Sequence, residues 1–425
     1  MENFTMTTIT ELNYTEPTPA RIICAPPPGW TGIPPPGIYA NIADILHRVV
    51  LPIIIISGTF GNLVTVIILL RHSRVLSTTG MFLMSLAVSD TVLLYTAPLR
   101  RWIISVWEID IRHNGRVACK TSVYLTYCSI QFSSWVLVAV TIERVISVVW
   151  PHRVKLNFTK KNTMLFISTL FVAIFGLNSH ILYGFGHSKL REHRGKGFCE
   201  PQYEGYLQFW TKMYSFIDFV VAFALPFVVL VISNAIIIQK LKQAHQKRKS
   251  MSSMAKPSGP SDGDQSHNVT ILLISLGVIF FICMAPVSVF FIYFPYWNEL
   301  NEKWTCINAY EYFRQNEIQQ LVFAVVIVLG YTNASINFFL YVASGTKFRS
   351  QIKALFLCRP VRPDSVFGSI NTSQNRKRFT VYSEISSIEK ASGASKMHDE
   401  VVMSTEGSTD HTTVTRSKTD LAEKY

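Results

Sequence analysis

Charged residues are scarce in this chain. Asp, Glu, Lys and Arg make up 16% of its 425 residues, against roughly 25% in soluble globular proteins. Acidic residues are fewer than basic ones: the chain has 27 Asp and Glu and 40 Lys and Arg, which gives a net charge of +13. Seven cysteines in this length exclude a disulfide-dense mini-protein. The low charge, together with 28 phenylalanines, excludes a disordered protein and a coiled coil.

Familiar catalytic and cofactor motifs are also missing. The chain has no Gly-rich phosphate loop and no HExxH or Cys-x-x-Cys metal spacing. No module of interleaved basic and aromatic residues stands outside the apolar stretches, so we do not expect nucleic-acid binding. The N-terminus lacks a basic region followed by a short apolar core, so we expect no cleaved signal peptide. The sequence therefore predicts neither an enzyme nor a resident cofactor.

Long apolar stretches are what the chain does have. The mean hydropathy is +0.25, and seven stretches reach the roughly 20 residues that a helix needs to cross a bilayer. In lipid, a helix is the open-chain structure that satisfies its own backbone hydrogen bonds. We therefore predict an all-α membrane protein, a bundle of seven transmembrane helices. The predicted spans are Val49–Leu70, Met81–Leu99, Thr121–Ile142, Asn162–Gly186, Met213–Gln239, Asn268–Asn298 and Ile318–Thr346.

Basic residues indicate how the bundle is oriented. If the N-terminus is outside, the inner segments hold 17 Lys and Arg in 71 residues, and the outer segments hold 14 in 114. Lys and Arg concentrate on the cytoplasmic side, where they face anionic lipids. The N-terminal segment also carries two glycosylation sequons, at Asn3 and Asn13. Both signals predict a multi-pass plasma-membrane protein with an extracellular N-terminus.

The cysteines agree with this layout. Four of the seven fall in the predicted outer segments: Cys24, Cys119, Cys199 and Cys306. The outer compartment is oxidising, and four cysteines allow three pairings, which the residues alone leave open. Cys358 follows the last span in an amphipathic run over 347–360. We expect this run to form a membrane-surface helix with a palmitoylated Cys358, the alternative being an unmodified thiol.

Short motifs lie in register along the spans. The third span ends in Glu143-Arg144-Val145, with Cys119 25 residues before the arginine. Further motifs occupy the other spans and loops: Gly61-Asn62, Leu86 to Asp90, Trp107, Cys199, Pro226, Pro286, and Asn333 to Tyr341. Over residues 49–358 this pattern resembles the rhodopsin-like (class A) G-protein-coupled receptors.

The resemblance implies roles for several residues. It implies a disulfide between Cys119 and Cys199. It also implies that Arg144, with Glu143 and Tyr341, engages a heterotrimeric G protein. A guanidinium at the inner end of a helix can pair with Glu143 and later with carbonyl groups of such a partner.

A buried charge lies in the second span. Ionisable residues inside a membrane are costly and are functional candidates by default. The resemblance implies a sodium-type site formed by Asp90, Ser133, Asn333 and Asn337. The alternative is a protonated Asp90 that is hydrogen-bonded to the two amides.

Some positions depart from the family pattern. Phe338 stands where a proline usually follows Asn337, so we expect a less kinked seventh helix. Met284 occupies the place of the sixth-helix tryptophan. Ser266, and not an acid, stands at the start of the sixth helix, so we expect no ionic lock between that helix and Arg144.

Asp218 is a charge that the family pattern does not demand. It lies eight residues, about two helical turns, before Pro226, at the level of an outer cavity. One acid with two arginines suits a polar, amidated or zwitterionic ligand, and the alternative is an ion pair between Asp218 and an arginine. The ligand-pocket candidates are Asp218, Arg100, Arg101, Thr126, Gln131 and Met284.

The outer segments favour a peptide ligand. Amine receptors of the family carry an aspartate where this chain has Thr126, and no lysine near 325–330 can form a retinal Schiff base. The second outer loop is basic and the third is acidic. Cys24 could pair with Cys306 across the pocket mouth, the alternative being two free thiols. The whole resembles invertebrate neuropeptide receptors of the FMRFamide and myosuppressin type, which implies a short amidated peptide.

The predicted organisation has four parts: an extracellular N-terminus (1–48), the receptor domain (49–346), the amphipathic helix (347–360) and a cytoplasmic tail (361–425). The tail holds 19 Ser and Thr in 65 residues, which predicts disorder. The resemblance implies receptor-kinase phosphorylation and arrestin binding there, or else no role. Three rivals to a peptide receptor stay open: a class A receptor for a non-peptide small molecule, a secondary transporter, and a receptor-like protein without signalling.

Overall fold

The computed structural model describes most of the chain between the two terminal segments. The described residues are 37–71, 77–150, 158–188, 198–251, 263–307, 309–344 and 346–357. Several predictions fall outside them, namely the sequons at Asn3 and Asn13, Cys24, the palmitoylation site Cys358 and the tail from 361. The side chain of Cys306 also lies outside the described part. These predictions stay predictions.

Seven helical segments are long and apolar enough to cross a membrane, which confirms the predicted bundle. They are Ile38–Arg71, Thr78–Trp107, Arg116–Val149, Lys160–Gly184, Glu204–Gln243, Ile274–Asn301 and Tyr310–Ala343. Most are longer than predicted. The first begins at Ile38 rather than Val49, because helical hydrogen bonding continues through the polar turn around Asp44 and Arg48. Hydropathy marks only the part of a helix that would lie in lipid.

Each span is built from one or more helical segments. The first and fifth spans include π-helical turns. The first two spans comprise α1 (Ile38–Ile45), η1 (Leu46–Val50), α2 (Leu51–Arg71), α3 (Thr78–Thr96) and α4 (Pro98–Trp107). The third and fourth comprise α5 (Arg116–Val149), α7 (Lys160–Leu177) and α8 (His180–Gly184). The fifth comprises α9 (Glu204–Gln208), η5 (Phe209–Tyr214), α10 (Ser215–Asp218), η6 (Phe219–Ala224) and α11 (Leu225–Met251). The last two are α12 (Gly263–Ile307) and α13 (Ala309–Ser344).

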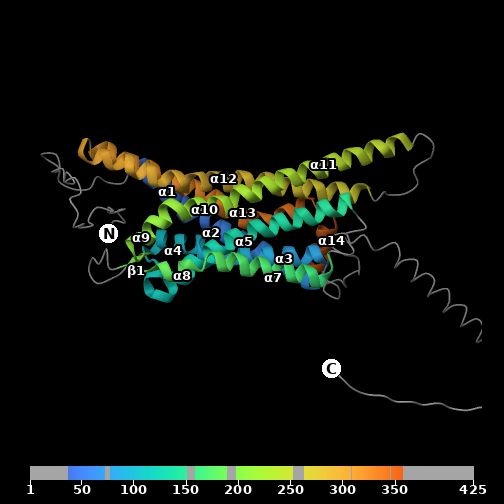
Figure 1. Ribbon diagram of the computed structural model, residues 1–425, viewed down its shortest axis with the longest axis horizontal. Coiled ribbons are helices and arrows are strands. Elements are labelled where there is room, and N and C mark those ends of the chain that lie inside the picture. Colours follow the sequence, from blue (N-terminus) through green and yellow to red (C-terminus); the bar gives the residue numbers. More distant parts are fainter. Residues whose placement is uncertain are drawn as a thin grey trace, which may run out of the picture. The chain divides into compact units, whose positions relative to one another are not determined.

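The elements outside the spans mark the two ends of the bundle. The short 3₁₀ helix η3 (Ile111–Asn114) joins α4 to α5, and β1 (Phe185–Ser188) pairs antiparallel with β2 (Phe198–Pro201). Figure 1 shows α4, α8, β1 and α9 at one end and α14 (Thr346–Phe356) at the other. We call these the hairpin end and the α14 end. Placement of α14 on a membrane surface stays a prediction.

Close helix packing explains one departure in the seventh span. A side chain at Gly61 of α2 would bring its Cβ within 2.6 Å of the Cβ of Phe338, so the two helices touch because Gly61 has none. Phe338 is buried there and packs edge-on against Phe60 and Phe348. Helix α13 runs unbroken through Phe338 to Ser344, as expected for a residue that keeps its backbone N–H.

Candidate functional site

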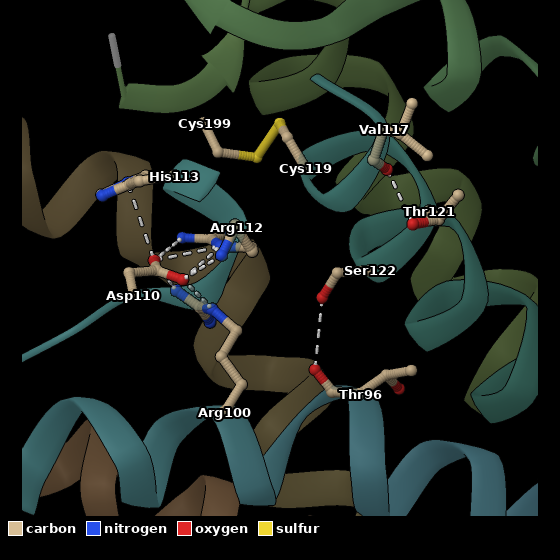
Figure 2. The surroundings of a disulfide bond; sticks show 10 residues. All are labelled: Thr96, Arg100, Asp110, Arg112, His113, Val117, Cys119, Thr121, Ser122 and Cys199. Carbon is tan, nitrogen blue, oxygen red and sulfur yellow. Dashed lines mark hydrogen bonds and ion pairs between the residues drawn. A yellow bond between two sulfur atoms is a disulfide. The ribbon is translucent and has the colours of Figure 1, made fainter. Parts of the chain in front are cut away.

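A disulfide joins the hairpin end to the bundle. Cys119 in the first turn of α5 is bonded to Cys199 in β2, with 5.5 Å between their Cα atoms, which confirms that pairing. Figure 2 shows this disulfide beside the loop that carries Asp110 and Arg112. The bond holds β2 against the first turn of α5, where both cysteines are buried among aromatic side chains.

The Asp110 carboxylate in that loop lies next to three basic side chains, those of Arg100 in α4 and of Arg112 and His113 in η3. Its carboxylate accepts hydrogen bonds from Nε and Nη2 of Arg100 at 2.9 and 2.6 Å. It also accepts from Nη2 of Arg112 at 2.8 Å and from the backbone N–H of Arg112 at 3.0 Å. His113 Nε2 lies 3.7 Å away (Figure 2). Burial alone would raise the pKa of Asp110, but the hydrogen bonds and charges of Arg100 and Arg112 outweigh it and hold the pKa well below its ordinary value.

Arg101, the next residue along α4, does not join this set. Its guanidinium carbon lies 5.0 Å from the centre of the Phe323 ring on α13, a cation–π contact. No hydrogen bond or ion pair joins either arginine to Asp218 among the described residues, and the predicted ligand cavity shared by the three stays a prediction. Arg100 is held by Asp110 instead, because the turn at Glu108 brings the loop acid back over α4.

Asp218 belongs to a second, uncharged set of partners. Gln131 of α5 donates to Asp218 Oδ1 at 2.8 Å, and Asn178 donates to Gln131 Oε1 at 2.7 Å. The Tyr214 hydroxyl donates to Asn178 Oδ1. Gln131 and Asn178 are completely buried. The predicted alternative, an ion pair between Asp218 and an arginine, does not occur among the described residues.

Two other ligand-pocket candidates, Thr126 and Met284, contact neighbouring residues of the helices. The Thr126 hydroxyl donates to the Ser122 carbonyl one turn earlier in α5, at 2.8 Å. Met284 is 7% exposed and packs in the main hydrophobic core with Phe280. Met284 therefore belongs to the hydrophobic core, and its role as a ligand contact stays a prediction.

The predicted sodium-type site is assembled in part. Ser133 donates to Asp90 Oδ1 at 2.7 Å and Asn337 donates to Oδ2 at 2.8 Å. Asp90 is 1% exposed. Asn333 makes no hydrogen bond to Asp90 in the part of the chain that the structure describes. Carboxylate, hydroxyl and amide oxygens are suitable ligands for a hard cation, so the residues present fit the predicted ion.

Arg144 and Glu143 meet threonines of the neighbouring helix. Glu143 accepts hydrogen bonds from the hydroxyls of Thr78 and Thr79, at 2.5 and 2.8 Å, and Arg144 Nη2 donates to the Thr79 hydroxyl at 2.6 Å. The predicted Glu143–Arg144 ion pair is not formed, because the carboxylate is taken up by the start of α3. Tyr341 is buried in the main hydrophobic core and packs edge-on against Phe348 of α14.

Sequence reasoning missed the role of Asp110 and the hairpin. An acid followed by Arg112 and His113 between two apolar spans was a signal for the first, since loop charges of opposite sign two or three residues apart can pair. The four-residue strands were too short to stand out. Among described residues, no group of three or more His, Cys, Asp or Glu could hold a metal ion.

Comparison with known proteins agrees with this arrangement. Residues 61–341 match the family described as 7 transmembrane receptor (rhodopsin family). The chain is also similar to a protein of Mus musculus described as "Probable C-C chemokine receptor type 3", at 24% identity over 310 residues, which cover 72% of this chain and 76% of the relative. The family is one of receptors and not of enzymes. The match spans the disulfide, Asp90 and Arg144 together, and the chain therefore belongs to the rhodopsin family of seven-transmembrane receptors.

Proposed function

We propose that this chain is a plasma-membrane receptor that binds an extracellular peptide at its hairpin end and activates heterotrimeric G proteins at its α14 end. The observation that supports G-protein coupling is the hydrogen bonding of the Arg144 side chain. Its guanidinium is held by one neutral hydroxyl, on Thr79, rather than by an acid. A neutral hydrogen bond contributes less than a charge-assisted pair, so Arg144 can change partner at low cost.

Signalling then follows from differential affinity. A ligand that binds the outward-swung state of the sixth span more tightly shifts the population toward that state. Arg144 leaves Thr79 and donates instead to carbonyl groups of the G protein. Glu143 stays on α3, because both its oxygens keep their threonine donors. In this scheme the acid fixes α3 to α5 while the arginine is free to exchange.

A peptide fits the hairpin end better than a small amine does. The disulfide holds β2 over a group of aromatic side chains that includes Tyr127, Trp210 and Tyr214, which pack edge-on or stacked with centroids 4.6–5.5 Å apart. Such rings offer large contact area to peptide side chains. The relative's printed name, a chemokine receptor, also concerns a polypeptide ligand. We propose a short amidated neuropeptide of the FMRFamide or myosuppressin kind.

The Asp90 site is proposed to bind sodium when the receptor is inactive. The hydroxyl of Ser133 and the amide of Asn337 already hold both carboxylate oxygens, and their own oxygens are ligands for a hard cation. Asp90→Asn should abolish any dependence of the receptor's Tm on sodium relative to choline. If the Tm of Asp90→Asn still depended on sodium, sodium would not bind at Asp90.

The test of function is a screen of amidated neuropeptides in cells that express the receptor, with calcium and cyclic-nucleotide readouts. We expect at least one peptide to give a concentration-dependent response that is absent from untransfected cells. Substrate uptake without guanine-nucleotide exchange would favour a transporter instead. Ligand binding that is insensitive to added G protein would favour a receptor-like protein without signalling.

Arg144→Ala should abolish the response in that screen while surface expression is retained, because Arg144 is the group that contacts the G protein. Arg71→Ala, at an exposed arginine of the same end, is the matched control and should signal normally. Full signalling by Arg144→Ala would show that coupling does not pass through this side chain.

A further inference from the structure

Arg101 differs from the two arginines beside it. Arg100 and Arg112 are bonded to Asp110, whereas the guanidinium of Arg101 has no hydrogen bond or ion pair with any residue that the structure describes. Its Nε is fully buried. The ring of Phe323 lies against it, with 5.0 Å between the guanidinium carbon and the ring centre, and Asp110 acts on it only electrostatically, without a hydrogen bond.

His47 supplies a second unpartnered nitrogen. It lies in η1 and is 6% exposed, and its Nε2 is buried without a hydrogen-bond partner among the described residues. The charge of Arg101 acts on His47. The element η1 packs against both α4, which carries Arg101, and α13, which carries Phe323. Two polar groups from neighbouring elements thus lack partners in one place.

Asp110 cannot balance this charge. Both its oxygens are hydrogen-bonded to Arg100 and Arg112, so among the described residues it offers Arg101 an electrostatic interaction but no hydrogen bond. A buried charge without a partner costs free energy. A site that served only packing would be expected to hold an apolar residue or a second acid where Arg101 stands.

We propose that Arg101 and His47, beside the ring of Phe323, bind a carboxylate of the extracellular ligand. The inference deepens the proposed function, on which it rests, by naming one chemical group of the ligand. A guanidinium presents N–H donors in a fork that matches a planar carboxylate, and the neutral imidazole can donate a further hydrogen bond from Nε2. A ligand cation would be repelled here.

Two ligand sources carry this group, an acidic side chain and a free C-terminus. In an amidated peptide the carboxylate must come from Asp or Glu. Model compounds separate the sources without a known agonist: N-acetylphenylalanine carries a C-terminal carboxylate, N-acetylglutamic acid α-amide a side-chain carboxylate, and N-acetylphenylalanine amide neither.

The experiment measures the Tm of the purified full-length receptor in nanodiscs as each compound is added at constant ionic strength. We expect one acid or both to raise the Tm by about 2 to 4 °C at ten times its Kd, and the amide to have no such effect. The acid that acts identifies the source. Because no G protein is present, loss of coupling and loss of this site are read separately.

Arg101→Gln should remove the acid-dependent shift, and Arg48→Gln, an exposed arginine next to His47, should keep it. Without any compound, Arg101→Gln should have a Tm no lower than that of Arg48→Gln, because among the described residues the lost guanidinium has no hydrogen bond or ion pair. Equal shifts with acid and amide, no shift with either acid, an unchanged shift in Arg101→Gln, or a marked loss of Tm in that variant alone would each overturn the proposal.

Discussion

Two aspartates near the hairpin end, Asp110 and Asp218, are held in opposite ways. Asp110 is surrounded by cations and accepts from Arg100 and Arg112. Asp218 is held by the neutral amide of Gln131, which is supported in turn by Asn178. We call these the charged set and the neutral set.

The difference suits the two sets to different roles: the neutral set holds helices in place, and the charged set lies beside a group that we propose to bind ligand. The neutral set links α5, the end of α7, η5 and α10, and its buried Gln131 and Asn178 bond to other protein groups. Such a network fixes the positions of helices and leaves little for a ligand. Beside the charged set lies Arg101, whose guanidinium we propose to bind a ligand carboxylate. We therefore expect Asp218 to position helices rather than to contact the ligand, and agonist potency to change little in Asp218→Asn.

Breaking the charged set should have the largest effect on stability. Asp110→Asn leaves Arg100 and Arg112 without a counter-charge in a place where their side chains are 18% and 21% exposed. Removing one partner of a buried ion pair costs about 3 to 5 kcal/mol, and this partial exposure puts the expected loss near the lower value, about 3 kcal/mol. Thermal unfolding in nanodiscs measures it.

The pH dependence of that loss is its control. The pKa of Asp110 is held below its ordinary value, so its stabilisation is fully present above the unfolded pKa of about 3.9. It is lost as the pH falls toward the lower folded value. The Tm gap between wild type and Asp110→Asn should therefore be equal at neutral pH and at about pH 5 and should shrink below about pH 4. A gap that closes above pH 5 would contradict this assignment.

Breaking the neutral set should cost less. Gln131→Met keeps the side-chain volume but removes the donor to Asp218 and the acceptor for Asn178. Asn178 still donates to the Ile174 carbonyl at 2.8 Å. The main cost in stability therefore comes from Asp218 Oδ1, which loses its donor. An unsatisfied buried polar group costs about 1 to 3 kcal/mol. We expect a Tm loss smaller than that of Asp110→Asn, and a larger one would reverse the ranking of the two sets.

The fold and the contacts set by helix register were largely predictable from sequence. Seven apolar stretches of sufficient length fix the number of spans. Cys119, Asp90 and Arg144 lie on continuous helices, so their spacing along the chain translates directly into position. The disulfide and the bonds of Asp90 to Ser133 and Asn337 followed from that register.

The partners at the hairpin end were not predictable in the same way. Whether Arg100 faces Asp218 or Asp110 depends on the path of the loop after Trp107, where Glu108 adopts a left-handed conformation with φ 57°. Hydropathy and spacing carry no information about such a turn. Asn178 was overlooked because a polar residue close to the end of a span reads as an interfacial residue, although it is completely buried.

The smallest expected effect belongs to the Tyr214 hydroxyl. Tyr214→Phe keeps the ring, which stacks on Trp210 with centroids 4.6 Å apart, and removes only the donor to Asn178 Oδ1. One neutral hydrogen bond contributes about 1 kcal/mol, so the Tm should fall less than in Gln131→Met. The matched control is Tyr124→Phe, whose hydroxyl donates to the Phe175 carbonyl at 2.9 Å outside the neutral set. Combining Tyr214→Phe with Gln131→Met tests the network itself, because residues that share partners lose less together than the sum of their single losses. Strict additivity would mean that the four side chains act as separate pairs, and the neutral set would then lose its role as a single support between α5 and the fifth span.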